Sequence, residues 1–340
     1  MKICFLSEYY SPKYGGQYAS VKGTVDICKL KKLNYSIIHK NSKTYLDKKK
    51  LERTLKSCDI VHIFGGWTLF YVKISLLALR LEKKLIVHPM GFYEPWSLSQ
   101  KKFKKKLAWH LYQKKLLRRA HLVHCASENE EYNLKKLDPK LKCIVLPFGV
   151  NKKNIRTKIL KKINRRCVFF SRLHKKKGLD MLIKTWVELK NENWSLDIVG
   201  YGNRKYYKDI IKDKKRSNIK FLKPISNLSK KNKLLDNYDL LVLPTLNENF
   251  GIVILESLAR GLPVLTTNET PWIEIQNQNA GWIINYSSIE LKLVLSQIFN
   301  TKKKDFFIKK KNAIKIANNF SKEKISNQYY KTYKKLIRQK

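Results

Sequence analysis

The sequence predicts an α/β protein made of two doubly wound domains, each a parallel sheet with helices on both faces. Three observations predict this: short apolar runs alternate with stretches of helical spacing, the alternation begins again after Asn151, and 340 residues suit two domains of roughly 150 residues each. Hydrophobic residues make up 43% of the chain, enough for two cores. We expect the two domains to face a cleft.

The first domain is expected over residues 1–155. Its strands should be the apolar runs at 2–7, 35–39, 59–65, 84–91, 121–127 and 143–149, with helices after Gly16, at 69–81 and, as one long basic helix, within 99–119.

The second domain is expected over residues 156–324. Its strands should lie at 167–171, 196–200, 219–223, 239–244 and 262–267, and its helices at 179–190, 206–214 and 253–260.

The chain is strongly basic, with 72 Lys and Arg against 26 Asp and Glu and a formal net charge of +46. Such a charge favours anionic partners such as nucleic acid, anionic lipid or phosphorylated substrates. The basic residues nevertheless extend from Lys2 to Lys340, so a solvated surface filled with lysine by compositional bias explains the same number. Both interpretations stay open.

Six widely spaced cysteines without a Cys-x-x-Cys pair suggest neither a zinc site nor a disulfide framework, and they fit a reducing compartment. No stretch reaches the ~18 apolar residues needed to span a bilayer. We therefore expect a cytoplasmic protein, either free or peripheral on the inner face of the cytoplasmic membrane.

The segment 239–267 carries the most chemical information. A buried strand is followed by the loop TLNENFG and then by a helix that begins near Ile252. Glu248 lies in the loop and Glu256 lies eight residues later, inside the helix. Because the first N–H groups of a helix lack partners and carry partial positive charge, the turn at Gly251 is a candidate phosphate site.

Two further loops follow expected strands, at the sheet edge where ligands bind in open α/β sheets. Arg172 and Lys177 lie in the first loop, where a guanidinium fork and an ammonium charge could together neutralise a diphosphate. In a chain this basic, a solvated loop is the competing interpretation. Gly200 and Gly202 lie in the second loop and allow close backbone approach to a ligand.

These segments resemble the family-4 retaining glycosyltransferases of the two-domain GT-B type. The resemblance is carried by SRLHKKKG, LDIVGYG and NENFGIVILESLARGLPVLTT, the last with the Glu-x7-Glu pattern, and more loosely by YYSPKYGGQ near the N-terminus. The segment TPWIEIQNQNAGWII looks like the group of these enzymes that builds lipopolysaccharide and other surface polysaccharides.

The resemblance implies a role for each matching position. Glu256 would bind the ribose of a nucleotide-diphosphate sugar, Glu248 the hydroxyls of its sugar, and Arg172 with Lys177 its diphosphate. The phosphate cradle would be completed by backbone N–H groups of Phe250, Gly251, Ile252 and Gly16, beside Gly200 and Gly202. The sugar would pass to a glycan or lipid-linked acceptor held by the first of two Rossmann-like domains, against which a C-terminal helix at 325–340 would pack.

No Asp-x-Asp pair occurs in the sequence, so a divalent metal has no obvious carboxylate pair. We expect no metal and no cofactor, with cationic side chains acting on the diphosphate instead.

A departure from the family pattern concerns the histidine that often precedes a glycine in the first domain. Met90 stands at that place, and His88 lies two residues earlier on the same strand face. His88 is a candidate to contact the donor sugar, with a structural histidine as the alternative. His62, at the end of another strand, is a weaker candidate.

Two other classes compete with a glycosyltransferase. One is a GT-B relative with different chemistry, a sugar-nucleotide epimerase or a glycan phosphorylase. The other, based on charge alone, is a nucleic-acid-binding protein, but no RNA- or DNA-binding signature occurs in the sequence.

The segment 99–119 has nine basic and no acidic residues and is a candidate contact with anionic membrane through Lys101, Lys102, Lys104, Lys105 and Lys106. A domain helix with solvated lysines is the alternative. In a regular helical projection Lys114 and Arg118 fall in the same arc as the apolar stripe of Phe103, Leu107 and Leu111.

Overall fold

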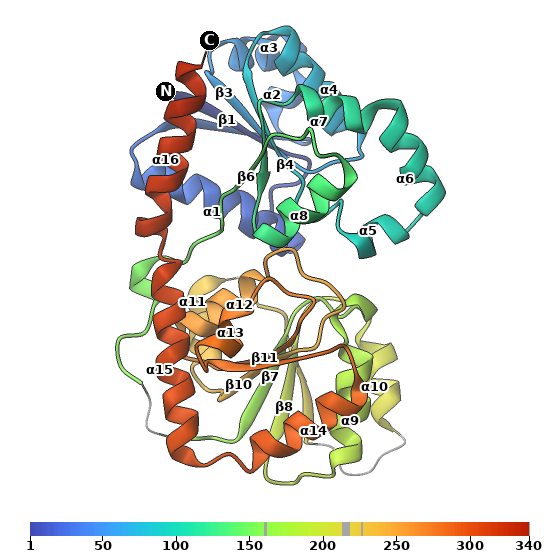
Figure 1. Cartoon of the computed structure of the whole chain (residues 1–340), viewed down its shortest axis with the longest axis vertical. Helices are drawn as coiled ribbons and strands as arrows, with labels where there is room; N and C mark the ends of the chain where they lie inside the picture. The colour runs from blue at the N-terminus through green and yellow to red at the C-terminus, as the bar shows by residue number, and fades with distance from the viewer. Residues whose placement is uncertain (160–161, 213–217, 226, 340) are drawn as a thin grey trace. The chain divides into compact units, whose positions relative to one another are not determined.

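The computed structural model describes residues 1–159, 162–212, 218–225 and 227–339. The chain forms two compact units, unit 1 with Met1–Gly149 and Lys322–Lys340, and unit 2 with Val150–Ser321 (Figure 1). Residues 150–155 therefore lie with unit 2 and residues 322–324 with unit 1, whereas the sequence favoured the opposite assignment for both. Each unit is described by itself.

Unit 1 is built on a parallel sheet, in which the described strands follow the order β2-β1-β3-β4-β5-β6. They are β1 (Lys2–Ser7), β2 (Asn34–His39), β3 (Ile60–Phe64), β4 (Lys84–His88), β5 (Leu122–Cys125) and β6 (Cys143–Val145). The helices are η1 (Pro12–Tyr14), α1 (Gly16–Leu30), α2 (Lys43–Leu46), α3 (Lys48–Lys56), α4 (Leu69–Arg80), α5 (Pro95–Ser99), α6 (Lys102–Ala108), η2 (Trp109–Gln113), α7 (Lys114–Arg119), α8 (Glu128–Leu137) and α16 (Lys322–Arg338). The expected strands of the first half are confirmed.

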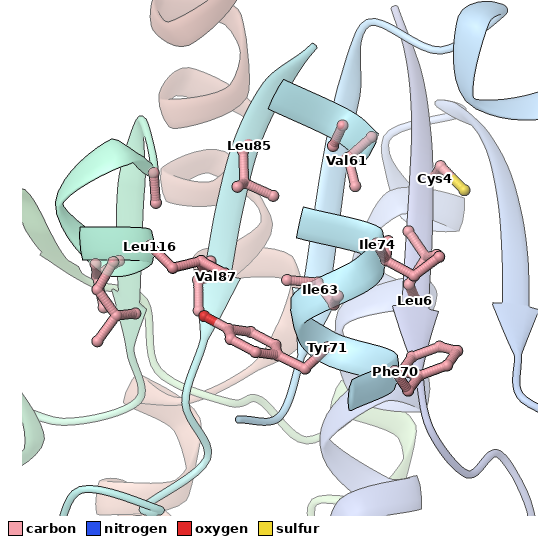
Figure 2. Packing of buried hydrophobic residues seen from close by; sticks show 14 of the residues in the cluster. Cys4, Leu6, Val61, Ile63, Phe70, Tyr71, Ile74, Leu85, Val87 and Leu116 are labelled. Carbon is pink, nitrogen blue, oxygen red and sulfur yellow. The ribbon is translucent and has the colours of Figure 1, made fainter. Parts of the chain in front are cut away.

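The core of unit 1 lies partly between this sheet and α4. Figure 2 shows Leu6, Ile63 and Val87, from β1, β3 and β4, on the sheet face that Tyr71 and Ile74 of α4 cover. None of the five is more than 1% exposed. Each such burial stabilises the fold by about 1.5–3 kcal/mol, which is why the apolar runs form the inner strands.

Unit 2 repeats the architecture with the strand order β12-β11-β10-β7-β8-β9 over its described residues. The strands are β7 (Arg166–Phe170), β8 (Ser195–Val199), β9 (Ile219–Leu222), β10 (Leu240–Leu243), β11 (Val264–Thr267) and β12 (Gly281–Ile284). The helices are η3 (Lys152–Asn154), η4 (Lys175–Lys177), α9 (Leu179–Leu189), α10 (Arg204–Lys212), α11 (Leu228–Leu235), α12 (Ile252–Ala259), α13 (Glu274–Asn277), α14 (Ser288–Phe299) and α15 (Lys303–Asn319). Both halves are thus doubly wound α/β units, as predicted.

The strand order of unit 2 reverses between β7 and β10. β7 pairs with β8 on one side and with β10 on the other, all in parallel. Loops that leave such neighbouring strands diverge to opposite faces of the sheet and open a crevice at its carboxyl edge. The loops after β7 and β10 therefore lie where a ligand site is expected in this fold.

The C-terminal helix α16 belongs to unit 1, where it packs against α1. At its start, the Nζ of Lys322 lies 2.8 Å from the Oδ2 of Asp26 in α1, and both side chains are mostly buried. The helix expected at 325–340 thus begins three residues earlier, and residue 340 lies outside the described residues.

The long basic helix expected within 99–119 is confirmed: a continuous helical stretch extends from Lys102 to Arg119, with a π-helical turn inside it. Lys101 adopts a left-handed backbone conformation with φ of 55° between α5 and α6, and residues 109–113 form a π-helical turn before α7. A π-helical turn holds more residues than an α-helical one, so a regular projection does not continue across it. Lys114 and Arg118 lie beyond this turn, in α7.

The helix expected at 206–214 is α10, which begins at Arg204, and its last two expected residues lie outside the described part of the chain.

Over the described residues, none of the helices combines the length and the apolar character that a membrane crossing requires.

Candidate functional site

Hydrogen bonds and close packing join the loops after β7 and β10. Gly178 ends the first loop with φ of +67°, and a Cβ there would lie 1.8 Å from the carbonyl oxygen of Pro244, so only glycine fits. The hydroxyl of Thr245 and the N–H of Leu246 donate to the carbonyl of Lys176 at 3.0 and 2.8 Å. The two loops at the strand reversal therefore form one continuous surface.

Lys177 and Glu248 form an ion pair across these loops. Their side chains are only 8% and 15% exposed, so each charge is largely removed from water and needs the other. The structure thus brings together two residues that the sequence placed 71 positions apart.

Arg172 extends from the same loop as an exposed side chain, and over the described residues its guanidinium makes no hydrogen bond or ion pair. The loop is electropositive: partial burial, followed by the charges of Arg172, Lys176 and Lys177, lowers the pKa of His174. The same charges that disfavour an imidazolium favour an anion at this place.

Trp272 holds the turn between the β10 loop and α12 in place. Gly251 is the N-cap residue with φ of +76°, and it has no side chain to accept hydrogen bonds from the first N–H groups of α12, which begins at Ile252. Phe250 is 5% exposed, stacks edge-on with Trp272 and accepts a hydrogen bond from its indole N–H. The aromatic side chain is core, and only its backbone can belong to a phosphate cradle.

Glu256 lies on α12 beside Lys231 of α11. The Lys231 Nζ donates to the Glu256 Oε2 at 2.6 Å, and the side chains are 17% and 13% exposed. No pattern in the sequence marks Lys231, because it is one of several lysines in the run SKKNK.

Gly200 and Gly202 are explained by packing within unit 2. A Cβ at Gly200 would lie 1.7 Å from the carbonyl oxygen of Ser171, and at Gly202, where φ is +147°, 2.5 Å from that of Leu173. The close backbone approach that both glycines allow is therefore to the β7 loop.

Gly16 belongs to unit 1, where it is the first residue of α1. A Cβ at this position would meet no atom within 4 Å, so packing does not require a glycine there.

His88 also belongs to unit 1, and it is fully buried at the end of β4. Its Nδ1 lies 2.7 Å from the carbonyl oxygen of His124, and burial lowers its pKa to about 4. The Nε2 atom is buried and has no partner over the described residues. This geometry favours the structural role for His88 over contact with a donor sugar.

Three buried histidines connect the sheet of unit 1 to α16. The Nδ1 of His124 lies 3.2 Å from the Nε2 of His62, whose Nδ1 lies 3.0 Å from the hydroxyl of Tyr333. Burial is the main cause that lowers the pKa of His62 and of His124 well below the usual value. The cluster of His62, His88 and His124 is therefore uncharged at neutral pH.

Groups of three or more His, Cys, Asp or Glu side chains that could hold a metal ion are absent from the described part of the chain.

The sequence matches two family models in succession. Residues 7–154 match "Glycosyltransferase Family 4" and residues 151–318 match "Glycosyl transferases group 1". The chain therefore belongs to the glycosyltransferases of the GT-B type, with a family 4 domain followed by a group 1 domain. This class replaces the epimerase, phosphorylase and nucleic-acid-binding alternatives.

Two curated relatives also match, one over most of the chain and one over about half of it. An uncharacterized 41.2 kDa protein in the cps region of Klebsiella pneumoniae is 25% identical over 312 residues, which cover 83% of this chain and 81% of that protein. The O-antigen biosynthesis glycosyltransferase WclY of Escherichia coli is 24% identical over 168 residues, 49% of this chain and 46% of WclY. The chain is thus related to polysaccharide and lipopolysaccharide glycosyltransferases.

The fold has solved counterparts. The structure of HepE from Anabaena in complex with UDP and glucose superposes with a TM-score of 0.78 at 20% identity, covering 98% of this chain and 99% of that one.

Proposed function

We propose that the chain is a retaining glycosyltransferase that moves a sugar from a nucleotide-diphosphate sugar to a glycan or lipid-linked acceptor in the synthesis of lipopolysaccharide or another surface polysaccharide. The observation that carries the proposal is the electropositive pair of loops at the strand reversal of unit 2, with Lys177, Arg172 and the N-terminus of α12. The cps and O-antigen relatives support the pathway, and the HepE complex supports a nucleotide-sugar donor.

The chemistry of sugar transfer explains this charge distribution. When the bond between the anomeric carbon and the diphosphate breaks, the electron pair stays on the diphosphate oxygen. Fixed positive groups stabilise that developing charge without reorganising, and Arg172, Lys177 and the N–H groups at the start of α12 are such groups. Lys177 has three N–H donors, so its ammonium can keep Glu248 in place while it binds a phosphate oxygen.

Within this account the two acidic residues hold the neutral parts of the donor. Glu248 would accept hydrogen bonds from the sugar hydroxyls and Glu256 from the ribose. Both carboxylates are paired with a lysine, so they can lie close to an anionic diphosphate with less repulsion.

Activity should not depend on a divalent metal. Arg172 and Lys177 supply the positive charge that a metal would otherwise bring to the diphosphate. We expect hydrolysis of the sugar nucleotide in the absence of acceptor to survive EDTA, measured with a panel of UDP-, GDP- and ADP-sugars. Complete loss of activity that Mg²⁺ or Mn²⁺ restores would contradict this mechanism.

The proposal includes peripheral contact with an anionic membrane on the cytoplasmic side. Phe103, Leu107 and Leu111, spaced four residues apart, are 88%, 62% and 67% exposed, and exposed lysines surround them. An apolar stripe bordered by cations suits the boundary between acyl chains and anionic headgroups. Lys105 is the exception, because its ammonium lies 5.8 Å from the centre of the Trp67 ring and donates to Ser97.

Replacing Lys101, Lys102, Lys104 and Lys106 by glutamine should abolish sedimentation with anionic liposomes at low salt. Each lysine near a charged surface contributes up to about 1 kcal/mol, and salt screens this attraction. Donor hydrolysis should stay unchanged, because the proposed diphosphate site lies in unit 2.

The matched control variant replaces four exposed lysines elsewhere by glutamine and so loses the same charge. They lie in α15 and directly before it: Lys302, Lys303, Lys304 and Lys311. It should sediment like the wild type. If the first variant also sediments like the wild type, the lysines are only a solvated face.

A further inference from the structure

Lys231 links three elements of unit 2 next to the proposed donor site. It lies on α11, its ammonium donates to Glu256 of α12 at 2.6 Å, and the same ammonium lies 5.1 Å from the ring centre of Phe170. Phe170 is the last residue of β7, directly before the loop that carries Arg172. The position of this ammonium is therefore fixed from two sides.

The surroundings of Glu256 require such a partner. The neighbouring side chains Ile254, Leu255 and Leu258 on α12 are at most 2% exposed, and the side chain of Glu256 is 13% exposed. An ionised carboxylate with little access to water is strongly disfavoured without an opposite charge or hydrogen bonds. Over the described residues, Lys231 is the one cation that pairs with Glu256.

Only one of the two oxygens of the Glu256 carboxylate takes part in this contact. Oε2 accepts from Lys231, whereas Oε1 makes no hydrogen bond to the described residues. A carboxylate can accept about four hydrogen bonds, so Oε1 and the remaining lone pair of Oε2 can receive the two hydroxyls of a ribose. Lys231 thereby determines which acceptor positions face a ligand.

We propose that Lys231 is a positioning residue for the donor: it holds the Glu256 carboxylate ionised and in one orientation, so that its free lone pairs accept hydrogen bonds from the ribose hydroxyls. It also neutralises Glu256, which would otherwise repel the diphosphate of the same ligand. The inference rests on the proposed function, in which the ligand is a nucleotide-diphosphate sugar.

The test compares two ligands that differ only in the ribose. UDP, GDP and ADP are titrated against the wild-type protein by calorimetry, and the tightest binder is then compared with its 2′,3′-dideoxy analogue. The wild type should prefer the ribonucleotide by about tenfold or more, since hydrogen bonds to a charged acceptor are stronger than neutral ones.

Lys231→Met should lower the affinity for the ribonucleotide by about tenfold and that for the dideoxy analogue much less, so the preference should disappear. Glu256→Gln should lose the preference as well, and adding Lys231→Met to it should cause little further loss. If the role of Lys231 were only structural, Lys231→Met would weaken the binding of both ligands equally. Lys231→Arg, which keeps the charge, should keep part of the preference.

Lys230→Met is the matched control, because Lys230 is an exposed lysine on the same helix. It should bind both ligands like the wild type. If Lys231→Met does not fold, Lys231→Gln, which keeps a hydrogen-bond donor without the charge, should show the same loss of preference.

The possible outcomes separate the two proposals. A wild type that binds none of the three nucleoside diphosphates overturns the proposed function. A folded Lys231→Met or Lys231→Gln protein that keeps the full ribose preference overturns the role of Lys231 alone. A wild type that binds both ligands equally also overturns it, while leaving the diphosphate site intact.

Discussion

Replacing Lys177 by alanine should lower the turnover of the sugar donor by about 100-fold or more, and replacing Arg172 by alanine should do the same. Both side chains are proposed to stabilise the charge that develops on the departing diphosphate, and removal of one such group from a catalytic site has an effect of this size. The measurement is donor hydrolysis with the sugar nucleotide that the wild type hydrolyses fastest.

The two variants should differ in their stability. Arg172 is exposed, so its replacement should leave the folded protein unchanged. Lys177 is 8% exposed and pairs with Glu248, so Lys177→Ala leaves a little-exposed carboxylate without its partner and should also destabilise unit 2.

Controls distinguish loss of catalysis from loss of structure. Lys177→Arg keeps the charge and should retain more activity than Lys177→Ala. Lys175→Ala removes an exposed lysine of the same loop and should be as active as the wild type. Full activity of both Arg172→Ala and Lys177→Ala would remove the cationic loop from the mechanism.

Unit 1 should lose stability steeply as the pH falls below about 6.5. The pKa of His88 is lowered from 6.5 to about 4 by burial, and burial also lowers the pKa values of His62 and His124 well below 6.5. In the unfolded chain these histidines take up protons below 6.5, whereas in the folded unit they stay neutral, so acid favours unfolding. Above 6.5 the effect is absent.

The expected size is large. Each histidine that stays neutral in the folded unit lowers the free energy of unfolding of unit 1 by up to about 1 kcal/mol for each pH unit below 6.5. Hydrogen exchange of peptides from β4 and β5, corrected for the intrinsic pH dependence of exchange, measures this loss as a fall in opening free energy.

An exposed histidine serves as the control. His110 lies on the π-helical turn at the surface, and His110→Asn should leave the pH profile unchanged. A flat opening free energy between pH 7 and pH 5 would show that the histidine cluster does not oppose protonation.

The alternation of apolar runs and helical stretches was sufficient to predict both sheets, because inner strands of a parallel sheet are buried on both faces. Val87 and Val242, for example, lie in such runs and are fully buried. The long helix within 99–119 was predicted correctly, but the π-helical turn inside it was not. The start of this helix depends on a left-handed residue, Lys101, which no local pattern marks, since lysine has no preference for that conformation.

The candidate site was predictable as a set of residues but not as a set of contacts. Spacing indicated Glu248, Glu256 and the cationic loop, because each follows a recognisable strand. The pairing of Lys177 with Glu248 depends on how the two loops bond to each other, which only the folded chain determines. Lys231 comes from a third element, and its neighbours in the sequence are also lysines.

The most direct test of the central claim, retaining transfer from a nucleotide-diphosphate sugar, follows the anomeric configuration of the released sugar. Proton NMR during donor hydrolysis without acceptor resolves the first anomer formed before mutarotation. A retaining enzyme should release the anomer that has the same configuration as the sugar in the donor, and Lys177→Ala should release it far more slowly. Release of the opposite anomer, or no release from any of the UDP-, GDP- and ADP-sugars, would contradict it.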